Sequence, residues 1–517
     1  MTEFRTVRAP RGMVSSIDHL ASSAGVALLR AGGSAADAAI GANAVLAVTS
    51  PYACGLGGDL FALVHEGEGA PAALNSSGRA GSGADAAQLR AEGHTTMPFR
   101  GDIRTVTVPG CADGWLALHR SYGRLPLADV FAPAIDYAAN GFPASPHLAP
   151  RIAEIAGIEG AADLWDRGPV APGTPLRRPG VARTLTALAS GDRAAFYQGE
   201  FGAGLLRLGG GHFTAADLER ANADWVTPLS VRVHGRDVWT MPPNSQGYLI
   251  LLHLAIAERL DLGDPDDPRW AHLMIEAARQ AGQDRPDVLY EDADVAPLLA
   301  ADEVARRRAA IDPGHRAVVA DNAAVGDTTY LCAVDDERRG VSLIQSNAAG
   351  FGSHLFEPAT GINLHNRGLG FSLAPGHPAE FAPGRRPPHT LAPTVVTRTD
   401  GTLHAVAGTM GGDAQPQIMA QILTRMLRHG AAPGDAVGAP RWGLTGASTG
   451  FDTWDTPDPS VELEPGHPEA WRTGLAARGH RVGATETVGH AHAIAVEDGM
   501  LAGAADPRVR NGDAQGY

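Results

Sequence analysis

Lysine is absent from this 517-residue sequence, so arginine supplies all 42 basic side chains. A Walker-type phosphate loop, a pyridoxal Schiff base and a Ser-x-x-Lys acyl enzyme each require a lysine, and all three are therefore excluded. Acidic side chains number 57, and the formal net charge is −15. Because nucleic acids and anionic membranes bind clustered positive charge, we expect small molecules as partners instead.

Cysteine and long apolar runs are also scarce. Cys54, Cys111 and Cys332 lie far apart without a C-x-x-C motif, which is typical of reduced core residues and not of a disulfide framework or a zinc site. The first residues lack the apolar stretch of a secretory signal, and no later run approaches the roughly 18 apolar residues of a membrane span. The sequence therefore predicts a cytoplasmic protein.

Glycine and proline are abundant, at 64 and 37 residues, as in a loop-rich globular protein. Apolar residues at helical spacing predict a helix over 15–30 and a second helix, capped by Ser34, that runs to Val48. The following Gly55-Leu56-Gly57-Gly58 turn leads into a strand but lacks the third glycine of a dinucleotide-binding fingerprint. The patterns over 110–310 are mostly helical.

Two β-hairpins are predicted in the last third of the chain. The first pairs 330–334 with 341–345 around a charged tip, and the second pairs 391–398 with 402–407 around an Asp-Gly turn. An amphipathic helix then runs to Gly430. Strands with helices on either side predict stacked sheets between helical layers.

The first hairpin is predicted to place the Thr328 hydroxyl beside other polar side chains. With its tip near Glu337 and Arg338, Thr328 faces Ser346 or Asn347 across the ladder. A threonine hydroxyl becomes a useful nucleophile only beside a base, and the residue's own amine can be that base once it is a chain terminus. The chain would have to be cut between Asp327 and Thr328. The alternative is a structural Thr that begins a strand.

Other segments resemble the γ-glutamyltransferase family of self-processing N-terminal-nucleophile (Ntn) hydrolases over nearly the whole chain. The motifs occur in the family's order: LLRAGGSAADAAIGANAVLAVTSPYACGLGGD, TVPGCADGW, MPPNSQG, DTTY, QSNAAGFGS, GTMGGDAQPQ, APRW and GAADPR. The resemblance implies a four-layer αββα sandwich, cut into a large subunit, 1–327, and a small subunit, 328–517. These subunits are expected to associate, and a dimer of such heterodimers is left open.

The resemblance also implies roles for single residues. Thr328 corresponds to the nucleophile, and Ser346 to the hydroxyl that hydrogen-bonds it. Gly411 and Gly412 correspond to the pair whose N–H groups form the oxyanion hole, a task suited to glycines before a helix N-terminus. Arg79 resembles the arginine that grips a substrate carboxylate, with a surface arginine as the alternative.

Several positions depart from the family pattern. Gly370 stands where an acidic residue binds the substrate's α-amino group, and Arg367 stands where a polar amide is usual. His389-Thr390 replaces a Ser-Ser pair that holds the α-carboxylate. Tyr330 replaces a histidine, and the stretch 371–385 is too short for the family's lid loop. Asn347, Arg367, His389 and Thr390 are therefore expected to bind substrate.

The predicted protein is an enzyme that transfers or hydrolyses γ-glutamyl or related carboxylate-bearing acyl groups through an acyl-Thr intermediate. Two alternatives stay open: an amidase for non-glutamyl, glutaryl-type amides, and an unprocessed, non-catalytic relative. No metal or organic cofactor is implied, and His490 and His492 are interpreted as structural. The donor is a small-molecule amide, and the acceptor is water or an amine.

Overall fold

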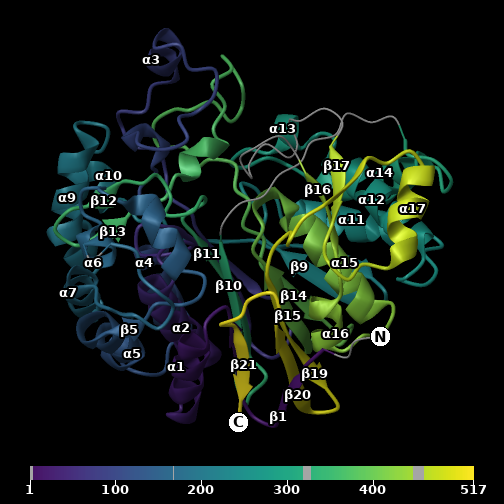
Figure 1. Cartoon of the computed structure of the whole chain (residues 1–517), viewed down its shortest axis with the longest axis horizontal. Helices are drawn as coiled ribbons and strands as arrows, with labels where there is room; N and C mark the ends of the chain where they lie inside the picture. Colours follow the sequence, from purple (N-terminus) through teal and green to yellow (C-terminus); the bar gives the residue numbers. More distant parts are fainter. Residues whose placement is uncertain (1–3, 167, 318–327, 446–458) are drawn as a thin grey trace.

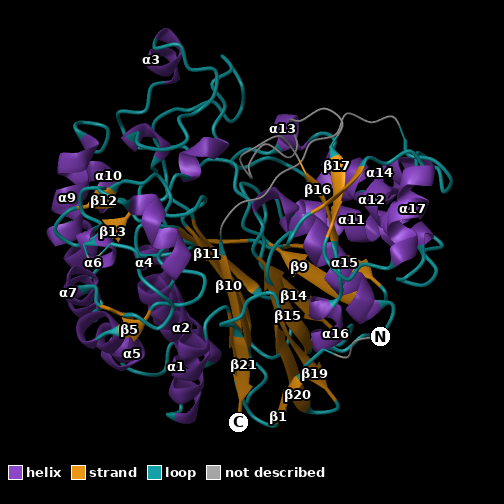
Figure 2. Ribbon diagram, viewed as in Figure 1, coloured by secondary structure: helices purple, strands orange, loops and turns teal. Residues whose placement is uncertain are grey.

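The computed structural model describes residues 4–166, 168–317, 328–445 and 459–517. Two seven-stranded sheets face each other at the centre, and helices cover the outer face of each sheet (Figures 1 and 2). The predicted arrangement of stacked sheets between helical layers is confirmed.

Each sheet combines strands from before and after Thr328. We call them sheet I and sheet II. Sheet I has the order β1 (Val7–Ala9), β20 (Met500–Ala505), β19 (Ala491–Glu497), β15 (Leu403–Thr409), β14 (Thr394–Thr397), β9 (Arg236–Thr240) and β8 (Leu229–Val233). Sheet II has the order β21 (Asp513–Gly516), β2 (Met13–Ser16), β10 (Thr329–Val334), β11 (Gly340–Ser346), β3 (Asp59–His65), β4 (Ala72–Ser76) and β7 (Asp224–Val226).

A separate apolar core lies between the two sheets. Phe61, Tyr330 and Ile344 of sheet II belong to the same buried cluster as Val406 and Ile494 of sheet I. Strands β10 and β11 are buried along their whole length, because one face meets sheet I and the other meets helices. Side chains on both faces of these strands are therefore held in fixed positions.

The helices form two outer layers. Those over sheet II include α1 (His19–Arg30), α2 (Ala35–Thr49), α4 (Cys111–Tyr122), α5 (Leu127–Asn140), α7 (Pro179–Leu188) and α9 (Glu200–Gly209). Those on the sheet I side include α11 (Tyr248–Glu258), α12 (Pro268–Gly282), α14 (Ala301–Ala309), α15 (Gln415–Leu427), α16 (Pro433–Gly438) and α17 (Glu469–Ala477). The short helices α3 (Ala86–Ala91), α10 (Ala215–Glu219) and α13 (Arg285–Val288) lie in the connections.

The predicted N-terminal helical hairpin is confirmed. Ser34 caps α2 with a reciprocal capping box, in which its side chain bonds the Asp37 N–H and the Asp37 carboxylate bonds the Ser34 N–H. Every residue of α2 is buried, including the polar Asp37, Asn43 and Thr49, because the helix lies between sheet II and the outer helices.

The hairpin register is also confirmed. Thr329 pairs with Gln345 across β10 and β11, so the next position back, Thr328, lies opposite Ser346. The second hairpin is shorter than predicted, with a first strand only over Thr394–Thr397, because 391–393 pass into a loop ending in Pro393.

The region over 110–310 contains strands that the sequence analysis missed. Strands β8 and β9 form a hairpin closed by His234 and Gly235, both at positive φ, and β7 adds an edge to sheet II. Among the described residues, no helix is long and apolar enough to cross a membrane. The cytoplasmic location stays a prediction.

Candidate active site

Thr328 is the residue immediately before β10, the strand that begins at Thr329. Its side chain is buried, at 2% exposure, and its Oγ1 shares a hydrogen bond of 3.1 Å with Ser346 Oγ on β11. Ser346 Oγ also accepts a hydrogen bond of 2.8 Å from the Ala348 N–H. The ladder between β10 and β11 thus fixes one hydroxyl against the other.

Arg367 extends this chain of contacts. Its Nη2 donates to Ser346 Oγ at 3.1 Å, and its Nη1 donates to Thr390 Oγ1 at 2.9 Å. The guanidinium is buried, and burial lowers its pKa to about 10, although the charges of Asp59 and Asp413 oppose that shift. Arg367 therefore stays cationic at neutral pH, two hydrogen bonds from the Thr328 hydroxyl.

The buried carboxylate of Asp59 lies near enough to Arg367 for their charges to interact. Asp59 of β3 pairs with Ser346 across the ladder, accepts the Nε2–H of His389 at 3.0 Å, and accepts the Gly78 N–H at 3.0 Å. Burial alone would raise the pKa of Asp59, but the His365 and His389 rings and the Arg367 guanidinium lower it to about 2. Burial, followed by the Arg367 charge, lowers the pKa of His389 to about 3. At neutral pH we therefore infer an ionised Asp59 and a neutral His389.

The Gly411-Gly412 turn approaches the same region from sheet I. Gly411 has φ +137° and Gly412 φ +55°, conformations that favour glycine. A Cβ at Gly411 would lie 2.9 Å from the Val488 carbonyl oxygen. The turn opens a short 3₁₀ segment, Gly412–Ala414, that runs directly into α15. Backbone N–H groups at such a helix start suit the stabilisation of a developing negative charge.

Side chains from the first part of the chain hold this turn in place. Gln246 Nε2 donates to the carbonyl oxygens of both Thr390, at 3.1 Å, and Gly412, at 3.0 Å. Arg285 Nη2 donates to the buried Asp413 carboxylate at 2.9 Å. These contacts connect the Gly411-Gly412 turn with Thr390, and through Arg367 with Ser346 and Thr328.

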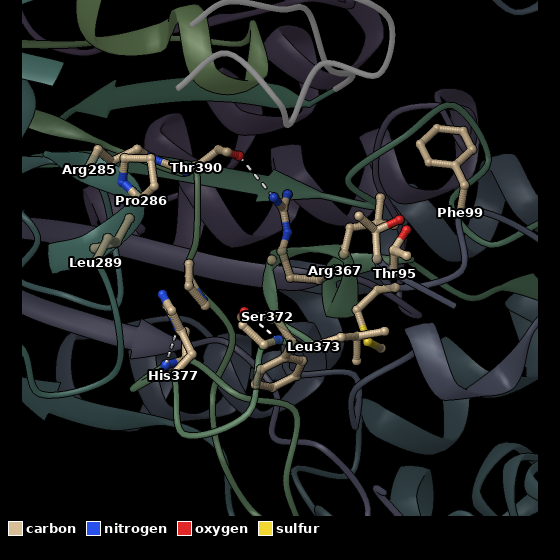
Figure 3. Close-up of a pocket in the computed structure, with 18 residues that line it drawn as sticks. Thr95, Phe99, Arg285, Pro286, Leu289, Arg367, Ser372, Leu373, His377 and Thr390 are labelled. Carbon is tan, nitrogen blue, oxygen red and sulfur yellow. Dashed lines mark hydrogen bonds between the residues drawn. The ribbon is translucent and has the colours of Figure 1, made fainter. Parts of the chain in front are cut away.

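A cavity of about 590 Å³ opens beside Arg367. Arg285, Pro286 and Leu289 form one side, Thr95 and Phe99 the other, and the loop containing Ser372, Leu373 and His377 lies below them in the view of Figure 3. Thr390 and Arg367 lie between these walls, joined by their hydrogen bond. No acidic side chain occurs among the lining residues in the described part of the chain, so the cavity suits an anionic ligand.

The departures from the family pattern have structural consequences here. Gly370 lines the cavity, and a Cβ at this position would lie 2.3 Å from the Pro388 carbonyl oxygen, so the backbone leaves no room for an acidic side chain. The short loop after Phe371 forms a cavity wall, with Arg90 bound to the Leu373 carbonyl oxygen and the Glu380 carboxylate.

The predicted substrate-binding residues divide into two groups. Arg367 and Thr390 line the cavity, whereas His389 is fully buried and turned toward Asp59. Asn347 is also fully buried, and its Nδ2 donates to the Pro51 carbonyl oxygen at 3.0 Å. Arg79 is not among the lining residues. Its guanidinium contacts the carboxylates of Glu291 and Asp224.

The roles suggested for Arg79, Asn347 and His389 therefore stay predictions. In this structure each of these side chains has a structural partner. Asp327, the predicted residue before the cleavage site, lies outside the described residues.

One cluster in the described chain has the composition of a metal site. His272, Glu276 and His480 place one possible ligand atom each within 4.8 Å of the others. The two histidines hydrogen-bond each other at 2.8 Å, and Glu276 already binds the Arg279 guanidinium at 2.5 Å, which disfavours an added cation. His492, interpreted as structural, hydrogen-bonds Ser15 Oγ at 3.2 Å.

Several residues of the candidate active site were not predicted from the sequence. Asp59 is the last residue of the quoted GLGGD motif, and Gln246 lies in MPPNSQG, so the motifs contained them without indicating their partners. The Arg285 to Asp413 pair joins residues 128 apart in the chain. No local pattern marks such a pair.

Comparisons with known proteins show which family the chain is similar to. The γ-glutamyltranspeptidase family model matches residues 21–517. A glutathione hydrolase-like YwrD proenzyme of Bacillus subtilis is 36% identical, over 98% of both chains. An oxamate amidohydrolase proenzyme of Klebsiella pneumoniae is also 36% identical, over 98% of both chains. The crystal structure of a cephalosporin acylase from Bacillus halodurans superimposes with a TM-score of 0.90 at 32% identity, covering 100% of this chain and 98% of that one.

The two facing sheets between helical layers are the fold of an Ntn hydrolase, an enzyme class that moves acyl groups from amides. Within that class, the chain belongs to the γ-glutamyltranspeptidase family. It is therefore an acyltransferase or amide hydrolase.

Proposed function

We propose that this chain is a proenzyme that cuts itself between Asp327 and Thr328 and then hydrolyses amides whose acyl group carries a carboxylate. The observation that carries the proposal is the continuous contact from the Thr328 hydroxyl through Ser346 to the Arg367 guanidinium, which lines the cavity. A nucleophile and a carboxylate-binding group are thereby held side by side.

Maturation begins with attack of Thr328 Oγ1 on the carbonyl carbon of Asp327. The C–N bond breaks, the nitrogen keeps its electron pair and gains a proton, and an ester joins the Asp327 carbonyl to Thr328 Oγ1. Water then hydrolyses this ester. The products are a large subunit, 1–327, that ends in a carboxylate and a small subunit, 328–517, whose first residue has a free amine. Because both sheets contain strands from each part, the two subunits stay associated.

In turnover the free amine of Thr328 acts as general base. It takes the proton from Oγ1 while Oγ1 attacks the substrate carbonyl, and the N–H groups of Gly411 and Gly412 bind the oxyanion. The proton passes to the departing amine, which leaves an acyl ester on Thr328. Water attacks this ester with the same base accepting its proton, and the free acid leaves. An amine that replaces water in the second step would give transfer.

The cavity favours a carboxylate over an ammonium on the acyl group. Arg367 offers a planar pair of N–H donors, the arrangement that best matches a carboxylate. At Gly370 the structure has no space for an acidic partner to an α-ammonium. Arg367 Nη2 is at most about 6 Å from Thr328 Oγ1, because two successive hydrogen bonds of 3.1 Å join them. Short dicarboxylic half-amides, from oxalyl to glutaryl, therefore fit best.

The names of the relatives support this range of substrates. One is called an oxamate amidohydrolase and another a glutathione hydrolase-like proenzyme, and both of the named substrates join an amide to a carboxylate-bearing acyl group. Hydrolysis of γ-glutamyl amides is the second candidate, favoured by the family to which the chain belongs.

The test is a panel of anilides that differ only in the acyl group: oxalyl, glutaryl, γ-glutamyl and the neutral butyryl. We expect kcat/KM for oxalyl or glutaryl to exceed that for butyryl by roughly 100-fold, the effect of one buried charge-assisted contact. Arg367→Met should remove most of this preference. Arg232→Met is the matched control, because Arg232 forms an exposed ion pair with Asp237 on β8 and β9.

Equal turnover of butyryl and glutaryl anilides would contradict carboxylate recognition. A clear preference for γ-glutamyl over glutaryl would show that the ammonium is recognised, and would select the second candidate. A single uncut chain without turnover of any anilide would select the non-catalytic alternative.

A further inference from the structure

A buried carboxylate lies directly after the Gly411-Gly412 turn. Asp413 is fully buried, and it is the acidic residue in the first turn of the 3₁₀ segment that leads into α15. A carboxylate at a helix start interacts favourably with the positive end of the helix dipole. An oxyanion bound by the Gly411 and Gly412 N–H groups would depend on the same positive end. Without a cation beside it, Asp413 would therefore weaken the proposed oxyanion site.

Arg285 supplies that cation. Its Nη2 donates to Asp413 Oδ1 at 2.9 Å, and the arginine is itself buried, at 9% exposure. The pair joins α13, in the first part of the chain, to a residue 128 positions later. Arg285 lies on one wall of the cavity, and Thr390 lies between Arg285 and Arg367 in the view of Figure 3. The charge pair is therefore part of the candidate active site.

Both charges of this pair act on the centre of the site. Burial lowers the pKa of Arg367 to about 10, the charges of Asp59 and Asp413 oppose this shift, and the charge of Arg285 adds to it. Arg367 is only two hydrogen bonds from the Thr328 hydroxyl. Two buried cations are thus balanced by two buried anions around this hydroxyl. Removal of Arg285 leaves an excess negative charge where the oxyanion would form.

We propose that Arg285 is a positioning residue of the reaction, which acts through Asp413 by cancelling the charge of this carboxylate beside the oxyanion turn. The inference rests on the proposed function, since it deepens the oxyanion role of Gly411 and Gly412. Attack on an amide places negative charge on the carbonyl oxygen as the transition state forms. Loss of Arg285 should therefore slow the reaction even of a substrate that carries no charge.

Two competing roles of Arg285 give different results. In the first, Arg285 holds the turn mechanically by way of Asp413, so that loss of either residue is equally harmful and neither loss rescues the other. In the second, Arg285 attracts a charged substrate directly, so that its loss affects only carboxylate-bearing substrates. Charge cancellation instead predicts that removal of the Asp413 charge rescues the loss of Arg285, with charged and neutral substrates alike.

The experiment compares Arg285→Met, Asp413→Asn and the double variant with the wild type, as full-length, matured protein. The substrates are the neutral butyryl anilide and the glutaryl anilide, and kcat/KM is normalised to the processed, folded fraction. Arg285→Met should lower kcat/KM for butyryl anilide roughly 30-fold, the effect of one uncompensated charge in a medium of intermediate dielectric constant. Asp413→Asn should stay within about three-fold of the wild type, and the double variant should recover roughly 10-fold over Arg285→Met.

Arg193→Met is the matched control. Arg193 Nε donates to the buried carboxylate of Asp113, on α4, at 2.6 Å, and Arg193 is not among the residues that line the cavity. This variant also leaves a buried carboxylate without its arginine. It should lower Tm as Arg285→Met does, while kcat/KM for both anilides stays within about two-fold of the wild type.

No recovery in the double variant overturns the inference, and so does a loss that is confined to the glutaryl anilide. Should Arg285→Met fail to fold because Asp413 stays buried and charged, the double variant is compared with Asp413→Asn alone. Values of kcat/KM for butyryl anilide within about three-fold of each other support the inference, whereas a difference of roughly 30-fold overturns it. If the wild-type protein hydrolyses none of the anilides, the proposed function itself has failed, which is a distinct result.

Discussion

Ser346→Ala tests the hydroxyl that hydrogen-bonds Thr328 Oγ1, the proposed nucleophile. The substitution removes contacts of Ser346 Oγ with Thr328 Oγ1 at 3.1 Å, with Arg367 Nη2 at 3.1 Å and with the Ala348 N–H at 2.8 Å. The contact with Arg367 is charge-assisted, and its loss should lower kcat by roughly 10- to 100-fold, or about 1.5–3 kcal/mol of activation free energy.

The same substitution also lowers stability, because buried donors lose their acceptor. A cost of about 1–3 kcal/mol for each such group, in a chain of this length, lowers Tm by about 1 °C per kcal/mol. We therefore expect Tm to fall by roughly 2–4 °C. The stability effect alone does not identify a catalytic role.

Ser342→Ala is the matched control. Ser342 lies four residues earlier on β11, is equally buried, and bonds Tyr330 Oη at 2.8 Å and the Thr394 N–H at 3.1 Å. This control should lose a similar amount of Tm while kcat stays within about two-fold, a difference of less than 0.5 kcal/mol. The assay is steady-state turnover of the best anilide, normalised to the processed fraction on a denaturing gel, together with thermal unfolding. Equal kcat in both variants would refute the role of Ser346.

Three further predictions concern the proposed nucleophile Thr328, the proposed oxyanion turn at Gly411, and the buried carboxylate of Asp59. Thr328→Ala should prevent both chain cleavage and turnover, whereas Thr328→Ser and the neighbouring Thr329→Ala keep both; cleavage of the Thr328→Ala chain would contradict self-processing. Gly411→Ala, with φ +137° and a Cβ 2.9 Å from a carbonyl oxygen, should lower kcat roughly 100-fold; turnover within two-fold of wild type would contradict an oxyanion role. Asp59→Asn should lower the free energy of unfolding by about 2 kcal/mol at pH 7, or Tm by about 2 °C. Because the pKa of Asp59 is lowered from 3.8 to about 2, this difference should be nearly constant above about pH 5 and largely lost by pH 2; an undiminished Tm difference at pH 2 would show that another interaction causes it.

Local patterns predicted much of the fold and placed Thr328 opposite Ser346, whereas the role of Thr328 as nucleophile was implied by the resemblance to a family and stays a prediction. The capping residue Ser34 and the charged tip of the first hairpin are encoded within a few residues of their structural effects. Once the tip of the first hairpin was placed, antiparallel pairing predicted which residue lies opposite Thr328. The order of strands and helices predicted stacked sheets between helical layers, and the resemblance to one family implied the four-layer αββα sandwich.

The substrate-binding predictions were less complete because they depend on contacts between distant segments. His389 hydrogen-bonds Asp59 of β3, which lies 330 residues earlier in the chain, so no local pattern indicated that its side chain turns toward Asp59. Arg79 meets Glu291, which lies far along the chain and has no sequence pattern in common with it. Strands β7 to β9 are three to five residues long, too short for their alternation to stand out from the helices around them.

N-terminal sequencing of the purified, active protein tests the central claim most directly. Two polypeptides are expected, one of them beginning Thr-Thr-Tyr-Leu at Thr328. A single intact chain of 53.6 kDa with full turnover, or a small subunit that begins at any other residue, would contradict the account.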